Sequence, residues 1–112
     1  MSKKNLRAYS RYCRNAVLLL GKLIRAGRKD CKLTAQEVAD RAGISRGLVQ
    51  RIEKGAPECS MGVVFEVATI VGVKLFDADQ STLTKHIRLT DEKLALMPMS
   101  IRKPKMVVDD DF

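Results

Sequence analysis

The sequence has few of the residues that stabilise small secreted or metal-dependent domains. Its 112 residues include no tryptophan, one histidine and three cysteines. Cys13, Cys31 and Cys59 are odd in number and widely spaced, so they predict neither a disulfide framework nor a set of zinc ligands. We interpret them as reduced thiols of a cytoplasmic protein that requires no metal or cofactor.

An apolar run long enough to cross a membrane is also lacking. The longest tract, residues 61–76, contains Glu66 and Lys74 and is shorter than the ~20 apolar residues that a bilayer requires. The basic start is followed by an apolar run that Lys22 interrupts and that no cleavage-site pattern follows, so a signal peptide is not predicted. We therefore expect a soluble protein.

Candidate catalytic groups are scarce. His86 is the only histidine and stands in a polar stretch, so we assign it no role. Glu53 has no second acid, histidine or metal ligand nearby in the sequence, which makes a poor active site. A redox-sensing role for Cys59 would need neighbouring basic residues that stabilise its thiolate, and no such cluster is present, so a structural role is preferred. We do not expect an enzyme.

What the sequence has in excess is positive charge. There are 21 Lys and Arg against 13 Asp and Glu, for a net charge of +8 and a pI of about 9.7. Residues 1–60 carry 14 basic and 5 acidic side chains, whereas residues 61–112 carry 7 basic and 8 acidic ones. This asymmetry predicts that a polyanion, either nucleic acid or an anionic membrane, contacts the first half of the chain.

Helical patterns dominate the first half. An amphipathic helix is predicted through residues 18–29, beginning upstream between Leu6 and Arg14. Thr34 and Glu37 form a capping-box pattern that opens a short helix, and Gly43 suits its left-handed C-terminal cap. The next N-cap, Ser45, follows almost at once. Two short helices joined this tightly predict a helix-turn-helix.

The second half is less clearly patterned. Ser60 predicts a fourth helix that ends at Gly72; its valines and isoleucines would also suit a strand, but the cap and the glycine favour a helix. Residues 73–79 are either a short strand or an extended segment, and Asp91–Leu96 one or two helical turns. Residues 98–112 predict an extended tail.

The predicted fold class is therefore all-α: a bundle of four or five helices with a helix-turn-helix, a possible short C-terminal strand and an extended tail. The predicted divisions are a basic helical extension (1–18), the helix-turn-helix domain (19–76), a connecting segment (77–97) and the tail (98–112).

The helix after Ser45 has two distinct faces. At 100° per residue one face carries Leu48, Val49 and Ile52, and the other carries Arg46, Gly47, Gln50, Arg51 and Lys54. Arginine and glutamine match the edges of guanine and adenine in the DNA major groove, which admits a helix. Gly47 would let the helix axis approach the bases closely. The alternative is an ordinary solvated face with a tolerated glycine, but the tight two-helix context and the basic charge favour DNA.

Residues 33–55, LTAQEVADRAGISRGLVQRIEKG, resemble the helix-turn-helix of lambda-repressor-like, Xre-type transcriptional regulators. The resemblance implies a symmetric homodimer on a palindromic operator. It implies base contacts by Ser45, Arg46, Gly47, Gln50 and Arg51. It implies phosphate contacts by Thr34, Gln36, Lys54 and helix-start amides. It also pairs Glu53 with Arg28 as a structural ion pair. One departure concerns the glutamine that grips a phosphate in many members: that place is Ala35 here, and the glutamine is Gln36.

The overall layout and the LFDAD region are similar to HipB-type antitoxins, which repress their own operon and hold a HipA-like serine/threonine kinase toxin. We therefore predict a repressor that acts as such an antitoxin. The alternatives are a stand-alone Xre-type repressor, or a protein-interaction module that has lost DNA reading.

Two further surfaces are predicted to bind proteins. The apolar stretch VVFEVATIVGVKLF offers more apolar side chains than a small domain can bury, and predicts a dimer interface. Its members are Phe65, Ile70, Val73, Leu75 and Phe76. In the tail, an apolar block precedes Asp109, Asp110, Asp111 and Phe112. This end is either a solvating segment or an anchor for a basic cleft on the kinase partner.

Overall fold

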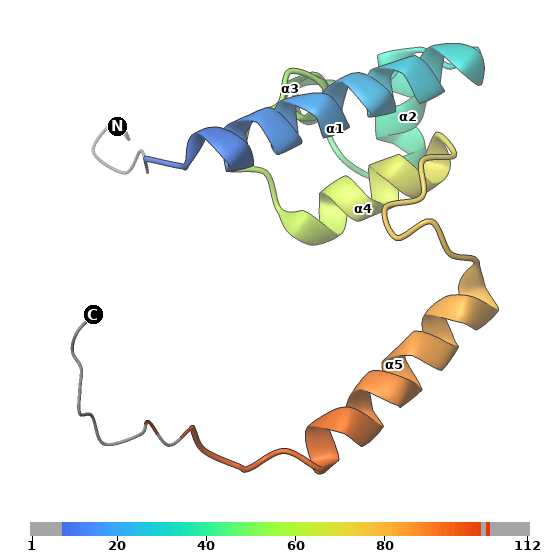
Figure 1. Ribbon diagram of the computed structural model, residues 1–112. Helices are drawn as coiled ribbons and strands as arrows, with labels where there is room; N and C mark the ends of the chain where they lie inside the picture. The colour runs from blue at the N-terminus through green and yellow to red at the C-terminus, as the bar shows by residue number, and fades with distance from the viewer. Residues whose placement is uncertain (1–7, 102, 104–112) are drawn as a thin grey trace. The chain divides into compact units, whose positions relative to one another are not determined.

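The computed structural model describes residues 8–101 and 103, which contain five helices and no strand (Figure 1). The helices are α1 (Arg11–Asp30), α2 (Ala35–Ala42), α3 (Arg46–Glu53), α4 (Met61–Ile70) and α5 (Gln80–Ala95). They belong to two compact units, residues 1–77 with α1 to α4 and residues 78–112 with α5. The predicted all-α fold class is confirmed.

The first helix, α1, is continuous over 20 residues. It begins at Arg11, within the predicted range, where the Ser10 hydroxyl accepts a hydrogen bond from the Cys13 amide at 3.1 Å. Gly21 and Ile24 are buried, whereas the basic residues of α1 except half-buried Arg28 are exposed. One helix thus supplies both core packing and positive surface charge.

The helix-turn-helix consists of α2, a tight turn and α3. The predicted capping box at the start of α2 is present: Thr34 Oγ1 accepts from the Glu37 amide at 3.0 Å, and Glu37 Oε1 accepts from the Thr34 amide at 2.8 Å. Gly43 ends α2 with φ +71°, a conformation that costs glycine little because it has no Cβ. The Ser45 hydroxyl then caps α3 by accepting from the Leu48 amide at 3.1 Å. These local contacts set the angle between the helices.

Eight apolar residues of the first unit are buried and form one core: Ile24, Val38, Ala39, Val49, Ile52, Val67, Ala68 and Val71. Each of the four helices of this unit contributes to this core, and Val71 belongs to the C-cap of α4. Gly21 lies against the end of α3, where a Cβ would come within 2.6 Å of the Ile52 carbonyl oxygen. The core and this close backbone contact hold α3 on the rest of the unit.

The fourth helix confirms the choice of helix over strand for residues 61–70. Ser60 occupies the predicted N-cap position, but its side chain makes no capping hydrogen bond. Residues 73–79 contain no strand; the segment bends at residues 75–77, where Asp77 has φ +51°, so it is not fully extended either.

The second unit differs from the sequence-based expectation. Instead of one or two turns near Asp91–Leu96, it contains a helix of 16 residues, α5. Asp79 caps it by accepting from the Thr82 amide at 2.9 Å. The β-branched threonines obscured this helix, since they lower helix propensity. In the structure the hydroxyls of Thr84 and Thr90 donate to the carbonyls four residues earlier, at 3.0 and 2.7 Å.

Candidate nucleic-acid interface

The two faces expected on α3 are present in the structure. Val49 and Ile52 are buried and Leu48 is half-buried against the core. The opposite side is exposed and consists of Ser45, Arg46, Gly47, Gln50, Arg51 and Lys54. We call Ser45, Arg46, Gly47, Gln50 and Arg51 the reading face. Because its far side is fixed in the core, α3 presents these groups on a rigid support.

Gly47 has open space around it. The nearest atom that an added Cβ would meet is the Ser45 hydroxyl oxygen, at 3.9 Å. Within the described part of the chain nothing therefore requires glycine at this position, which also has an ordinary helical backbone. The close approach expected at Gly47 is therefore one between the helix backbone and another molecule.

The ion pair implied by the resemblance joins α1 to the end of α3. Arg28 Nε donates to Glu53 Oε2 at 2.6 Å, and Arg28 Nη2 donates to Glu53 Oε1 at 3.0 Å. A third donor, Nη1, reaches the Leu33 carbonyl at 3.0 Å. Hydrogen bonding to Glu53 raises the pKa of the Arg28 guanidinium, so this arginine stays charged. The bidentate geometry fixes where α3 ends relative to α1 and to the turn before α2.

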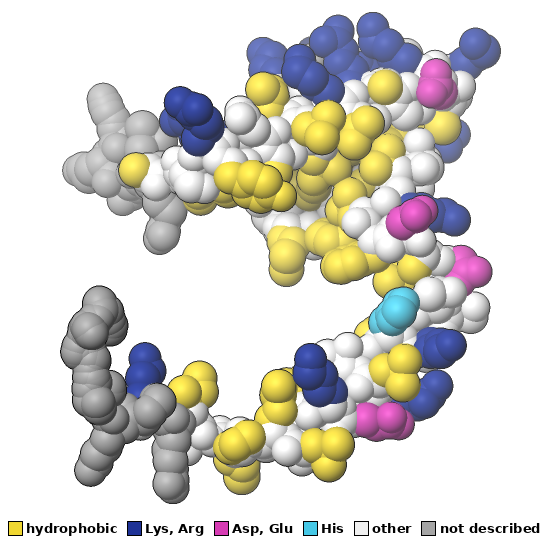
Figure 2. Space-filling model, viewed as in Figure 1, with side chains coloured by type: hydrophobic (Ala, Val, Ile, Leu, Met, Phe, Trp, Pro, Cys, Tyr) yellow, Lys and Arg dark blue, Asp and Glu magenta, His cyan; other side chains and the backbone are white. Residues whose placement is uncertain are grey.

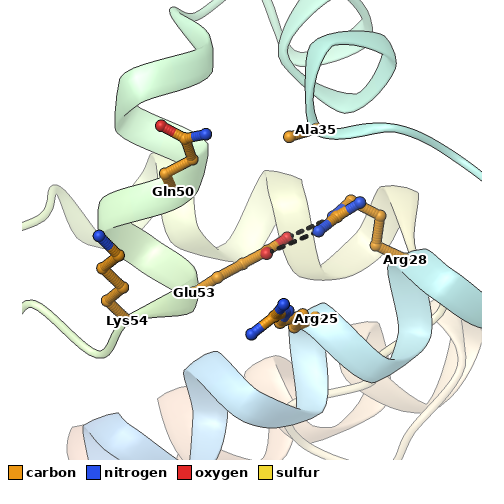
Figure 3. A pocket seen from close by; sticks show the side chains of 6 residues that line it. All are labelled: Arg25, Arg28, Ala35, Gln50, Glu53 and Lys54. Carbon is orange, nitrogen blue, oxygen red and sulfur yellow. Dashed lines mark hydrogen bonds and ion pairs between the residues drawn. The ribbon is translucent and has the colours of Figure 1, made fainter.

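Next to this ion pair lies a pocket of about 270 Å³ between α1, α2 and α3 (Figure 3). It is lined by Arg25, Arg28, Ala35, Gln50, Glu53 and Lys54. Glu53 supplies the only carboxylate of this lining and already pairs with Arg28. The pocket therefore keeps the charges of Arg25 and Lys54, both exposed, beside an α2 start that favours anions.

Arg25 lines the pocket but is not among the site residues predicted from the sequence. Arg25 stands three residues before Arg28 on α1, a spacing that places both on one side of the helix. That spacing was the available signal. The small Ala35 side chain lines the pocket at the start of α2, and the positive charge of the lining comes from α1 and from Lys54 at the end of α3.

The other expected phosphate contacts lie at the start of α2. Thr34 and Gln36 are both exposed. The Thr34 oxygen accepts the capping hydrogen bond, which leaves its hydroxyl proton available, while Gln36 Nε2 donates to Asp40 Oδ1 at 2.8 Å. Gln36 does not line the pocket. The structure thus brings Lys54 and Gln50 together with Arg25, and leaves Gln36 on the outer side of α2.

Positive side chains gather along the edge of the first unit where α1 and α3 lie (Figure 2). Exposed basic residues on these helices include Arg46 and Arg51 of α3 and Lys22, Arg25 and Lys29 of α1. This edge is suited to a polyanion that spans both helices.

The surfaces expected to bind proteins are placed only in part. Phe76 is 70% exposed and Phe65 37%, and their rings stack with centroids 6.0 Å apart. The other members of the predicted dimer interface, Ile70, Val73 and Leu75, are partly buried against the core. Asp109, Asp110, Asp111 and Phe112 lie outside the described residues.

The described part of the chain offers little for other chemistry. No group of three His, Cys, Asp or Glu residues there could hold a metal ion. Burial raises the pKa of the Cys59 thiol, which keeps it protonated and unreactive. No helix within residues 8–101 is long and apolar enough to cross a membrane.

Comparison with known proteins gives one match. The model of a helix-turn-helix domain family matches residues 19–80, more than half of the chain, which includes the core, the reading face and the pocket. No curated protein and no solved structure matches the chain. With α2, the turn and α3 in the required geometry, the chain belongs to the helix-turn-helix family, as a DNA-binding regulator of the Xre and lambda-repressor type.

Proposed function

We propose that the protein represses transcription by placing α3 in the major groove of a palindromic operator. The observation that carries this proposal is the reading face itself: exposed arginines and a glutamine on a helix whose other side is buried. Arg46, Gln50 and Arg51 offer donors and acceptors that match base edges, and the major groove is wide enough for a helix. An acidic or apolar face would instead have favoured an interaction module without DNA reading.

The pocket beside Arg28 supports a role in binding the DNA backbone. In this proposal one phosphate lies at the start of α2, between Arg25 and Lys54, while Thr34 and Gln36 contact the backbone from the outer side of that helix. Phosphate contacts of this kind orient the protein but do not select a sequence. Arg25 thereby supplies the phosphate contact that is lost because Ala35 stands at the position of a phosphate-binding glutamine.

Dimerisation follows from the proposed palindrome, because one α3 reads one half-site. The stacked pair Phe65 and Phe76 is the exposed part of the surface that we assign to the dimer, and its other members, Ile70, Val73 and Leu75, are partly buried against the core. Half-sites are expected about one helical turn, ~34 Å, apart.

Replacing Arg51 and Lys54 separately tests the assignment of base and phosphate contacts. On a duplex that the parent protein selects from a random pool, Arg51→Ala should cost about 1 to 3 kcal/mol of binding and relax base choice at one position. Lys54→Ala should weaken binding to selected and random duplexes alike and reduce the salt dependence. Fluorescence anisotropy over a salt series measures both.

The control is Lys85→Ala in the second unit, which should leave binding unchanged. If Arg51→Ala weakened random and selected duplexes equally, Arg51 would be a phosphate contact and the reading face would be wrongly assigned. Selection of sites without any palindrome would count against the dimer.

A finer version of the function is that of an antitoxin for a HipA-like kinase. It is supported by the resemblance in layout and by the composition of the chain end, where Asp109, Asp110, Asp111 and Phe112 would contact a basic cleft on the kinase. A stand-alone repressor is the alternative.

Affinity purification from the native host distinguishes the two functions, because an antitoxin retains a stoichiometric kinase. A chain lacking residues 106–112 should lose the kinase while keeping its affinity for DNA. Retention of the kinase by the shortened chain would transfer the contact to the helices.

A further inference from the structure

The second unit carries an apolar stripe that the proposed function does not use. On α5 and the turn after it, five residues follow one another at spacings of four, three, four and three: Leu83, Ile87, Thr90, Leu94 and Met97. At 100° per residue they lie within an arc of about 80° on one side of the helix. Met97 continues that side, since its amide donates to the Leu94 carbonyl at 3.1 Å. We call these five residues the α5 seam.

Four of the five seam residues are exposed, and only Leu83 is half-buried. No residue of α5 is buried, and Ile87 and Leu94 are 63% and 58% exposed. A helix of 16 residues gains little stability from its backbone alone, and most helices of this length depend on packing of an apolar side. A 4–3 repeat averages 3.5 residues, the period at which two helices keep one side in contact as they wind around each other.

Burying the seam would leave no hydroxyl without a partner. Thr90 is its one polar member, and its hydroxyl already donates to the His86 carbonyl at 2.7 Å. Its methyl group can therefore face a partner helix without the cost of an unsatisfied donor. The exposed salt bridge between Arg88 and Glu92, at 3.6 Å, lies on the opposite side of the helix. The seam itself therefore carries no charged side chain, although Leu89 and Leu96 are exposed on another side of the helix.

The polar side chains that flank the seam favour a second copy of α5 in parallel. With Ile87 and Leu94 at a positions and Leu83, Thr90 and Met97 at d positions, His86 and Lys93 occupy g positions and Asp91 an e position. In a parallel pair, a residue at a g position faces the residue at the e position of the next heptad on the partner helix. This places His86 of each helix opposite Asp91 of the other. In an antiparallel pair, g faces g, which would bring His86 toward Lys93.

We propose that α5 is a second dimerisation element, which pairs with α5 of another copy of this chain as a short parallel coiled coil. This inference goes beyond the proposed function, because it concerns the unit outside the helix-turn-helix. It rests on that function only in taking the protein to be a dimer. Two heptads make a weak coil alone. Tethered to first units that pair through the surface of Phe65 and Phe76, the two helices meet at high effective concentration.

The test compares two matched double variants of the full chain. Ile87→Gln with Leu94→Gln removes two seam side chains, and Leu89→Gln with Leu96→Gln removes two exposed apolar side chains outside the seam, also seven residues apart. Glutamine is a good helix former, so both variants should keep α5. Sedimentation equilibrium should show the dimer dissociation constant raised at least about a hundredfold by the first variant and changed less than about threefold by the second. Equal effects of the two variants, or none from the first, would overturn the proposal.

The direction of pairing has its own measurement. Leu83→Cys places a thiol at the first seam position, and oxidation should link two copies through it only if the helices run parallel and in register. A variant dimer that forms no more disulfide than the parent chain excludes the parallel pair.

The Ile87→Gln, Leu94→Gln chain should still bind a short random-sequence duplex with the parent salt dependence, because the basic edge of its first unit is unaltered. Loss of DNA binding by the parent chain itself would contradict the proposed function and leave the pairing of α5 standing.

Discussion

Replacing Glu53 with alanine is expected to lower the free energy of unfolding by about 3 to 5 kcal/mol. The side chains of Arg28 and Glu53 are only 14% and 7% exposed, and the guanidinium has a bidentate contact with the carboxylate. Removal of Glu53 leaves a largely buried positive charge without its partner, which costs more than the pair contributes while it is intact. For a small domain this is a large part of the total stability. Urea unfolding followed by circular dichroism measures the change.

Two companion variants make the result specific to the ion pair. Glu66→Ala removes an exposed carboxylate from α4 and should change stability by less than about 0.5 kcal/mol. The double replacement Arg28→Met with Glu53→Met removes both charges and keeps much of their volume, so it should recover most of the loss. If Glu53→Ala cost no more than Glu66→Ala, the pair would behave as a surface ion pair and could not fix α3 on α1.

Gly21→Ala is expected to cost about 2 to 3 kcal/mol, although alanine is the better helix former by about 1 kcal/mol. A Cβ on Gly21 would stand 2.6 Å from the Ile52 carbonyl oxygen and 2.8 Å from that of Glu53. Both are backbone atoms at the end of α3 and cannot rotate away, so α1 and α3 must separate. Thermal unfolding gives the stability, and DNA binding should fall as well because the base of the reading helix moves.

Glycines in open positions provide the controls. Gly62 in α4 has no atom within 4 Å of an added Cβ, and Gly47 has only the Ser45 hydroxyl oxygen at 3.9 Å. Alanine at either position should stabilise the protein by up to about 1 kcal/mol. A Gly21→Ala protein that was as stable as the Gly62→Ala protein would show that the helices are further apart than the structure has them.

The features that could be predicted from the sequence are those made by neighbouring residues. The capping box joins Thr34 to Glu37, and the N-cap joins Ser45 to Leu48, in each case across three residues. The left-handed turn depends on Gly43 alone. Each of these features is therefore visible in the residue order. The separation of Val49 and Ile52 from Arg46 and Arg51 follows from the helical period in the same way. The α5 helix was missed because its threonines bond to their own helix, which residue propensities do not describe.

The sequence by itself therefore determined the helix-turn-helix, its all-α class and the division of α3 into a core side and a basic side, because each depends on periodicity and short-range capping. The tertiary structure decided which of these polar side chains lie together. Arg25, Gln50 and Lys54 meet at one pocket only because Gly21 lets α1 cross the end of α3 at backbone contact and Arg28 holds Glu53 there. Residues 25 positions apart in the chain have no local pattern that connects them; the packing of three helices around a shared core does.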